Sequence, residues 1–186
     1  VAFPYDPRYW LYIEADAQTS LRTLDAVLRD TWLVCCGHMS SFTIGEEQYV
    51  APTEGAMSEY GDHSMRPRLS EVLDVGVRFL HEYDFGSTTE LTLEVVSRGA
   101  RRSKRGAANL LARNDSLEVT CGACGASATT LCSECQMEIE RPEDEPRTFF
   151  CEQCVTKRTA HLHGGEAEML MPIVNSPRMG VCGYTG

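Results

Sequence analysis

Paired cysteines dominate the chain between residues 121 and 163. Six of the nine cysteines form three Cys-x-x-Cys pairs, and a His-x-His sequence follows them. A Cys-x-x-Cys turn lets two thiolates reach one metal ion, and zinc takes four sulfur or nitrogen ligands in a tetrahedron. Eight donors therefore predict two zinc ions in closed sites. The predicted ligands are Cys121, Cys124, Cys132, Cys135, Cys151, Cys154, His161 and His163.

Other kinds of site use fewer of these donors. An iron–sulfur cluster needs four cysteines, a thioredoxin-like redox site uses one pair at the start of a helix, and a catalytic zinc keeps one coordination position open. A second interpretation of His161 and His163 is that both are exposed imidazoles. Three closely spaced pairs favour closed structural sites, but the spacing alone does not fix which pairs share an ion.

The three pairs resemble those of MYND and HIT-type zinc fingers. The shared features are Cys-x-x-Cys-Gly-x-x-Ala from residue 121, Leu-Cys-Ser-x-Cys from residue 131 and Phe-Phe-Cys-x-x-Cys from residue 149. The resemblance implies a cross-braced module, in which the first and third pairs share one ion and the second pair shares the other with the histidines. Such fingers bind proteins or stabilise folds. This chain departs from them in a longer acidic loop, 138–147, and in its terminal His-x-His.

The remaining three cysteines lie in two other sequence contexts. Cys35-Cys36-Gly-His38 places two thiols beside an imidazole, and Cys182 lies in Gly-Val-Cys-Gly-Tyr. A thiol beside an imidazole is typical of an activated nucleophile, so an enzyme using the His38 region, or Cys182 as a reactive thiol, is one alternative. Cysteines that end a helix are more often packed in a core. We favour packing in both contexts and predict no catalytic residue.

The overall charge argues against binding of phosphate backbones, because the formal net charge is −10. One local basic segment exists nonetheless. We interpret this segment as a solvated linker, with a nucleic-acid-binding arm as the alternative. Its residues are Arg98, Arg101, Arg102, Lys104 and Arg105. The sequence has no apolar run of membrane-spanning length, and VAFPYDPRYW does not read as a signal peptide, so we expect no membrane association and a cytoplasmic location.

Hydrophobic periodicity predicts an α+β fold for the first part of the chain. Apolar residues at helical spacing predict an amphipathic helix over 20–32, and alternation over 77–96 predicts a β-hairpin. His81 falls on the apolar face of that hairpin, which predicts a buried core histidine. The other predicted strands are 8–14, 38–44 and 108–113.

This part of the chain resembles the plasmid pRiA4b ORF-3-like family, which includes insertion-element proteins labelled TnpR. The resemblance covers residues 5–97 and implies an α+β domain without an established activity. Family members often carry His-Leu-His at the second strand, where this chain has Ser40, and an Asp and a Trp after Phe-Gly. The matching features are Tyr-Trp near the start, the Leu-x-x-Leu-x-x-Val-Leu helix, His38, Tyr83, Asp84, Phe85 and Gly86.

These features predict a chain of four segments. The predicted function is a non-catalytic zinc-binding protein that serves as an interaction or scaffold module for a protein partner. One alternative is a nucleic-acid accessory factor associated with mobile elements, and the other is the enzyme described above. The segments are an α+β domain (1–97), a basic linker with a connecting strand (98–115), a treble-clef or cross-brace-like zinc module (116–168) and a packed C-terminal tail (169–186).

Overall fold

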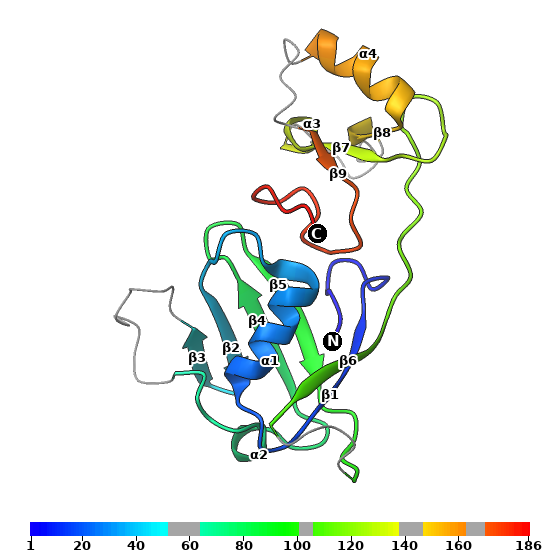
Figure 1. The fold of residues 1–186 in the computed structure, drawn as a ribbon. Coiled ribbons are helices and arrows are strands. Elements are labelled where there is room, and N and C mark those ends of the chain that lie inside the picture. Colours follow the sequence, from blue (N-terminus) through cyan, green and yellow to red (C-terminus); the bar gives the residue numbers. More distant parts are fainter. Residues whose placement is uncertain (52–63, 101–105, 138–146, 163–169) are drawn as a thin grey trace. The chain divides into compact units, whose positions relative to one another are not determined.

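The chain folds into two compact units, Val1–Asn114 and Asp115–Gly186. Both combine helices with antiparallel strands, which confirms the α+β class (Figure 1). No helix of the described residues has the length and apolar character needed to cross a membrane. The computed structural model describes residues 1–51, 64–100, 106–137, 147–162 and 170–186.

The first unit contains a four-stranded antiparallel sheet with the order β3-β2-β4-β5, and a separate antiparallel pair of β1 and β6. The predicted hairpin is present as β4 and β5, in which buried and less buried residues alternate. The segment predicted as a linker contributes β6 to this unit, because β6 pairs with β1. The strands are β1 (Leu11–Ala15), β2 (Ser40–Ile44), β3 (Glu47–Ala51), β4 (Arg78–Tyr83), β5 (Thr89–Glu94) and β6 (Ala108–Arg113).

The main helix of the first unit is α1 (Leu21–Leu28), which continues into a π-helical segment (Arg29–Leu33). The Ser20 hydroxyl caps α1 by accepting the Thr23 backbone N–H at 3.3 Å. The apolar stripe of α1 is buried, as is Trp32 in the π-helical segment. A short helix, α2 (Leu69–Val72), precedes β4.

A buried polar pair joins α1 to the four-stranded sheet. His81 Nε2 of β4 lies 2.8 Å from Asp25 Oδ1 of α1, and the two side chains are 0% and 4% exposed. The His81 ring also packs against Phe42 of β2, with 4.7 Å between the ring centroids. The prediction that His81 is a core histidine is confirmed. The pair fixes α1 on the sheet because neither group has water as an alternative partner.

The second unit contains a three-stranded antiparallel sheet with the order β8-β7-β9. After β9, the backbone at Gly180 lies close to side chains of β7 and α3. A Cβ atom added to Gly180 would overlap the side chains of Leu131 and Gln136, and Gly180 has a φ of +81°. The elements are β7 (Thr130–Cys132), α3 (Ser133–Met137), β8 (Phe149–Phe150), α4 (Glu152–Leu162) and β9 (Leu170–Pro172).

Asp25→Ala is expected to lower the free energy of unfolding of the first unit by about 3 kcal/mol, because it leaves His81 buried without its carboxylate partner. Urea denaturation followed by tryptophan fluorescence measures this unit alone, since Trp10 and Trp32 both lie in it. The control is Asp30→Ala, which removes an exposed carboxylate from the adjoining π-helical segment. Equal effects of the two substitutions would contradict the structural role of the pair.

Gly180→Ala is expected to destabilise the second unit by about 1–3 kcal/mol more than Gly183→Ala, because only the first substitution overpacks its surroundings. Both glycines have positive φ, but a Cβ at Gly183 would meet nothing within 4 Å. Both substitutions therefore carry the cost of an alanine at positive φ. The difference in stability between the two variants measures how closely Leu131 and Gln136 pack against Gly180. Hydrogen exchange of peptides from residues 130–137 measures it, and identical exchange in the two variants would argue against this packing.

Candidate metal centre

Four cysteine thiols converge in the second unit. The Sγ atoms of Cys121, Cys124, Cys151 and Cys154 all lie within 4.8 Å of one another, and those of Cys124 and Cys151 are 3.7 Å apart. Two thiolates bound at about 2.3 Å to one tetrahedral zinc ion are about 3.7–3.8 Å apart. The four sulfur atoms therefore fit one tetrahedral ion. They come from the first and third Cys-x-x-Cys pairs, the combination that the zinc-finger resemblance implies.

The first pair lies in a tight turn that precedes β7. The Cys121 backbone N–H donates to the Ala126 carbonyl at 2.7 Å, and the Gly125 N–H donates to the Cys121 carbonyl at 2.8 Å. Gly125 has a φ of +75°, a conformation that glycine adopts at little cost. The Gly122 N–H donates to the Phe149 carbonyl at 2.9 Å and ties the turn to β8. These bonds hold both thiols on one side of the turn.

The third pair, Cys151 and Cys154, lies at the start of α4. Cys151 follows β8 directly, and its carbonyl accepts the backbone N–H groups of Cys154 and Val155, each at 3.0 Å. Cys154 therefore lies in the first turn of the helix. The N-terminus of a helix carries a partial positive charge, which favours the thiolate over the thiol.

The surroundings shift the pKa values of Cys121, Cys151 and Cys154 in different directions. Burial raises the pKa of Cys121, but backbone N–H groups of Cys151, Ala123 and Cys124 together outweigh it and lower the pKa to about 6. The Cys154 backbone N–H likewise lowers the pKa of Cys151. Hydrogen bonds with Cys124 and Cys151 raise the pKa of Cys154 to about 12. Metal binding requires the thiolate form, which the backbone N–H groups favour at Cys121 and Cys151.

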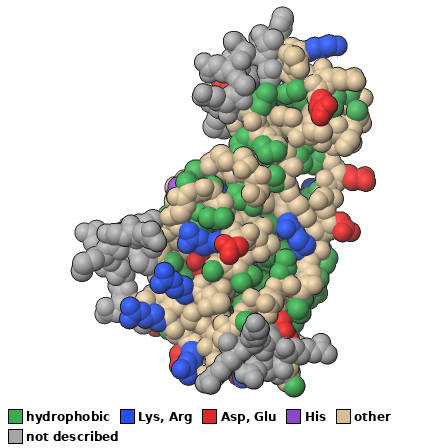
Figure 2. Space-filling model, viewed as in Figure 1, with side chains coloured by type: hydrophobic (Ala, Val, Ile, Leu, Met, Phe, Trp, Pro, Cys, Tyr) green, Lys and Arg blue, Asp and Glu red, His purple; other side chains and the backbone are tan. Residues whose placement is uncertain are grey.

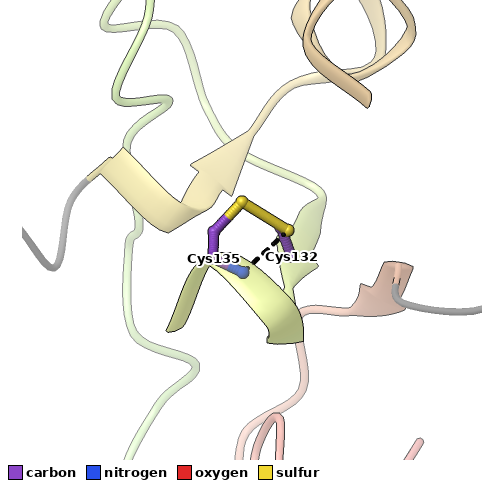
Figure 3. The surroundings of a disulfide bond; sticks show 2 residues. All are labelled: Cys132 and Cys135. Carbon is purple, nitrogen blue, oxygen red and sulfur yellow. Dashed lines mark hydrogen bonds between the residues drawn. A yellow bond between two sulfur atoms is a disulfide. The ribbon is translucent and has the colours of Figure 1, made fainter. Parts of the chain in front are cut away.

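The second pair in sequence differs from the prediction. The structure joins Cys132 and Cys135 in a disulfide, and the Cys135 N–H donates to Cys132 Sγ at 3.1 Å (Figure 3). Cys132 ends β7 and Cys135 lies in α3, which places their Cα atoms 5.3 Å apart, within the range that a disulfide bridges. In this form neither sulfur is a thiolate ligand. A zinc site at the reduced pair stays a prediction.

The histidines expected to complete that site contribute no described side chain. His161 falls within α4, in the part after residue 157 for which the structure describes the backbone only. His163 lies outside the described residues. The acidic loop 138–147 is likewise outside the description except for Arg147. Cys182 lies in the second unit with an exposed side chain and a φ of +50°.

A hollow of about 240 Å³ adjoins the thiol cluster. Gly122 and Ala123, which separate Cys121 from Cys124, line it together with Phe150. Arg147 adds a guanidinium to the lining. The shape of this hollow therefore depends on the turn that carries Cys121 and Cys124.

The basic segment is described only in part. The Arg98 guanidinium donates to the Leu73 carbonyl at 2.7 Å and lies 3.5 Å from the Asp74 carboxylate, so this arginine is tied to its own unit. On the face drawn in Figure 2, the described Arg side chains of the first unit lie in separate groups among acidic and hydrophobic ones. The other predicted contacts, Arg101, Arg102, Lys104 and Arg105, lie outside the described residues.

The residues of the pRiA4b-like motif cluster at one end of the sheet in the first unit. The Tyr83 hydroxyl accepts the His38 backbone N–H at 3.3 Å, and Asp84 Oδ2 lies 3.5 Å from His38 Nε2. The Gly86 N–H donates to Asp84 Oδ1 at 3.2 Å, and the Phe85 side chain is exposed. The sequence alone did not show that the carboxylate would lie beside His38, because this depends on how β2 and β4 pair.

No family model, curated protein or solved structure matches the chain. The resemblances to zinc fingers and to the pRiA4b ORF-3-like family therefore stay predictions, and the function is argued from the described geometry.

Proposed function

We propose that the second unit is a zinc-stabilised module of the treble-clef type and that the protein acts by binding a protein partner. The observation that carries the proposal is the convergence of Cys121, Cys124, Cys151 and Cys154 within 4.8 Å. Four protein ligands fill the coordination sphere of zinc, whereas a catalytic zinc keeps a position for water or substrate. A closed site supports a structural role for the ion.

The order of the elements supports the treble-clef assignment. A turn carries the first ligand pair, β7 and β8 follow, and α4 carries the other pair at its start. The buried cluster at the centre of this unit contains Cys121, Cys132, Phe150 and Cys151. Because cysteines make up most of that cluster, an ion bound there contributes directly to the folding free energy.

The hollow beside the thiol cluster is the binding face that we propose for the partner. Its Arg147 guanidinium is suited to an acidic side chain or a chain-terminal carboxylate of that partner. The four free thiols of the cluster fit a reducing compartment such as the cytoplasm, whereas the Cys132–Cys135 disulfide does not. The resemblance of residues 5–97 to the pRiA4b ORF-3-like family agrees with a non-catalytic protein, since that family carries no established activity.

Zinc removal is expected to unfold the second unit and leave the first unit folded. Native mass spectrometry should count one zinc ion fewer per chain in Cys124→Ser than in the wild type, and a chelator should accelerate hydrogen exchange throughout 115–137. The first unit should keep its cooperative unfolding transition, which tryptophan fluorescence follows. The control is Ala123→Ser, which adds a hydroxyl to the same turn and keeps all four thiols.

Two results would overturn the proposal. One is an unchanged zinc count in Cys124→Ser, which would show that the thiol cluster holds no ion. The other is turnover of a substrate at the zinc of the intact protein, which would require an open coordination position.

Arg147→Glu is expected to weaken partner binding at least about tenfold, because it reverses the charge in the hollow. Proteins captured by the immobilised full chain are compared between variants, and calorimetry with the purified partner then gives the dissociation constant. Lys157→Glu is the matched control, since it makes the same charge change on α4 of the same unit. Equal weakening by both variants would exclude the hollow as the binding face.

A further inference from the structure

A second group of metal-binding atoms lies in the first unit, where a Cys-Cys-Gly-His turn follows the π-helical segment. The sulfur atoms of Cys35 and Cys36 and a ring nitrogen of His38 all lie within 4.8 Å of one another. The two sulfur atoms are 3.6 Å apart, and Cys36 Sγ lies 2.8 Å from His38 Nε2. Thiols and an imidazole at this separation are donors for zinc and similar divalent ions.

The fold places this turn at the end of the four-stranded sheet. Val34 closes the π-helical segment by donating its N–H to the Arg29 carbonyl at 2.9 Å. Gly37 then takes a φ of +78° and turns the chain into β2. π-Helical segments are rare and occur frequently at functional sites. The irregular helix end and the turn together direct both thiols and the imidazole to one place.

Asp84 enters the same place from β4. Ser40 pairs with Tyr83 across the sheet, and the Asp84 N–H donates to the Met39 carbonyl at 2.9 Å. Asp84 has a φ of +64°, and its side chain is 7% exposed. A buried carboxylate on a left-handed backbone is costly without a compensating role. Here it brings Oδ2 to 3.5 Å from His38 Nε2.

We propose that Cys35, Cys36, His38 and Asp84 bind a divalent metal ion of the zinc type, separate from the four-cysteine centre. In a tetrahedral zinc site, two sulfur ligands are about 3.7–3.8 Å apart and a nitrogen and an oxygen ligand about 3.3 Å apart. The 3.6 Å between the sulfur atoms and the 3.5 Å between Nε2 and Oδ2 match these separations. Cys36 Sγ and Nε2, now 2.8 Å apart, must separate by less than about 1 Å, and the Asp84 carboxylate must close on the two sulfur atoms.

The geometry favours a metal site over a nucleophilic cysteine. In a Cys–His–Asp arrangement, the thiol and the carboxylate lie at opposite nitrogens of the imidazole, so that the acid orients the base. Here Cys36 Sγ and Asp84 Oδ2 both lie near Nε2 of His38. Donors that converge on one point form a coordination sphere. Tyr83 helps to orient His38, because its hydroxyl accepts the His38 backbone N–H and its ring packs edge-on against the imidazole.

Zinc titration of the full chain, purified under reducing conditions, tests this site. The expected result is that Zn²⁺ slows alkylation of Cys35 and Cys36 by iodoacetamide in the wild type. Amide resonances of Gly37, His38, Asp84 and Gly86 should shift on the same titration. If Zn²⁺ changes neither the alkylation rate nor the amide resonances of the wild type, the proposal is overturned. Fast alkylation of Cys36 alone, unaffected by Zn²⁺, would overturn it in favour of a nucleophile.

Variants then locate the ion. His38→Ala and Cys36→Ser should each bind one ion fewer than the wild type by native mass spectrometry, while Met39→Leu, at the neighbouring position, should bind the wild-type number. Co²⁺ in place of Zn²⁺ gives a further readout, because Cys124→Ser should leave a spectrum of mixed sulfur, nitrogen and oxygen ligation and Cys36→Ser should leave that of the four-cysteine centre. An unchanged ion count in both His38→Ala and Cys36→Ser would refute the site, whatever the four-cysteine centre does.

Discussion

The second unit is held together by its sulfur atoms more than by an apolar core. Its sheet is made of short strands, and the buried cluster at its centre includes three cysteines beside Phe150. The other buried apolar side chains, such as Leu131, Phe149 and Met171, are few, so cross-links at the cysteines help to offset the entropy of ordering the chain. The turn before β7, the start of α4 and the hollow with Arg147 all take their shape from this cluster. The shape of any partner-binding surface there therefore depends on whether the thiols are oxidised, reduced or bound to a metal ion.

The first unit depends instead on the register of β2 against β4. This register sets Phe42 opposite His81 within the core and Ser40 opposite Tyr83 at the end of the sheet. A slip by one residue would turn His81 away from α1 and separate His38 from Asp84 at the same time. The buried pair that holds the helix and the donors at the sheet end are therefore fixed by one set of backbone hydrogen bonds. Packing and ligand geometry cannot vary independently here.

Local patterns predicted the elements well, because periodicity and turn residues act over short distances. The β4–β5 hairpin, α1, the strand at 108–113 and the buried His81 all follow from spacing. What the sequence could not show depends on pairing between distant segments. In the sequence Asp84 is only one residue of a motif, and its place beside His38 follows from the pairing of β2 with β4. The disulfide between Cys132 and Cys135 could not be told from a ligand pair by spacing, since both arrangements suit two cysteines separated by two residues.

The pairing of β1 with β6 has a consequence for how the protein is made. Leu11 pairs with Arg113, and Trp10 exchanges hydrogen bonds with Asn114 through its own backbone N–H and carbonyl. During synthesis β1 leaves the ribosome long before this partner exists, so the nascent chain carries an open strand edge until residue 114 has emerged. A fragment cut at residue 97, the predicted end of the first domain, would keep that edge permanently. The segment predicted as a linker therefore supplies the strand that pairs with β1 in the first unit.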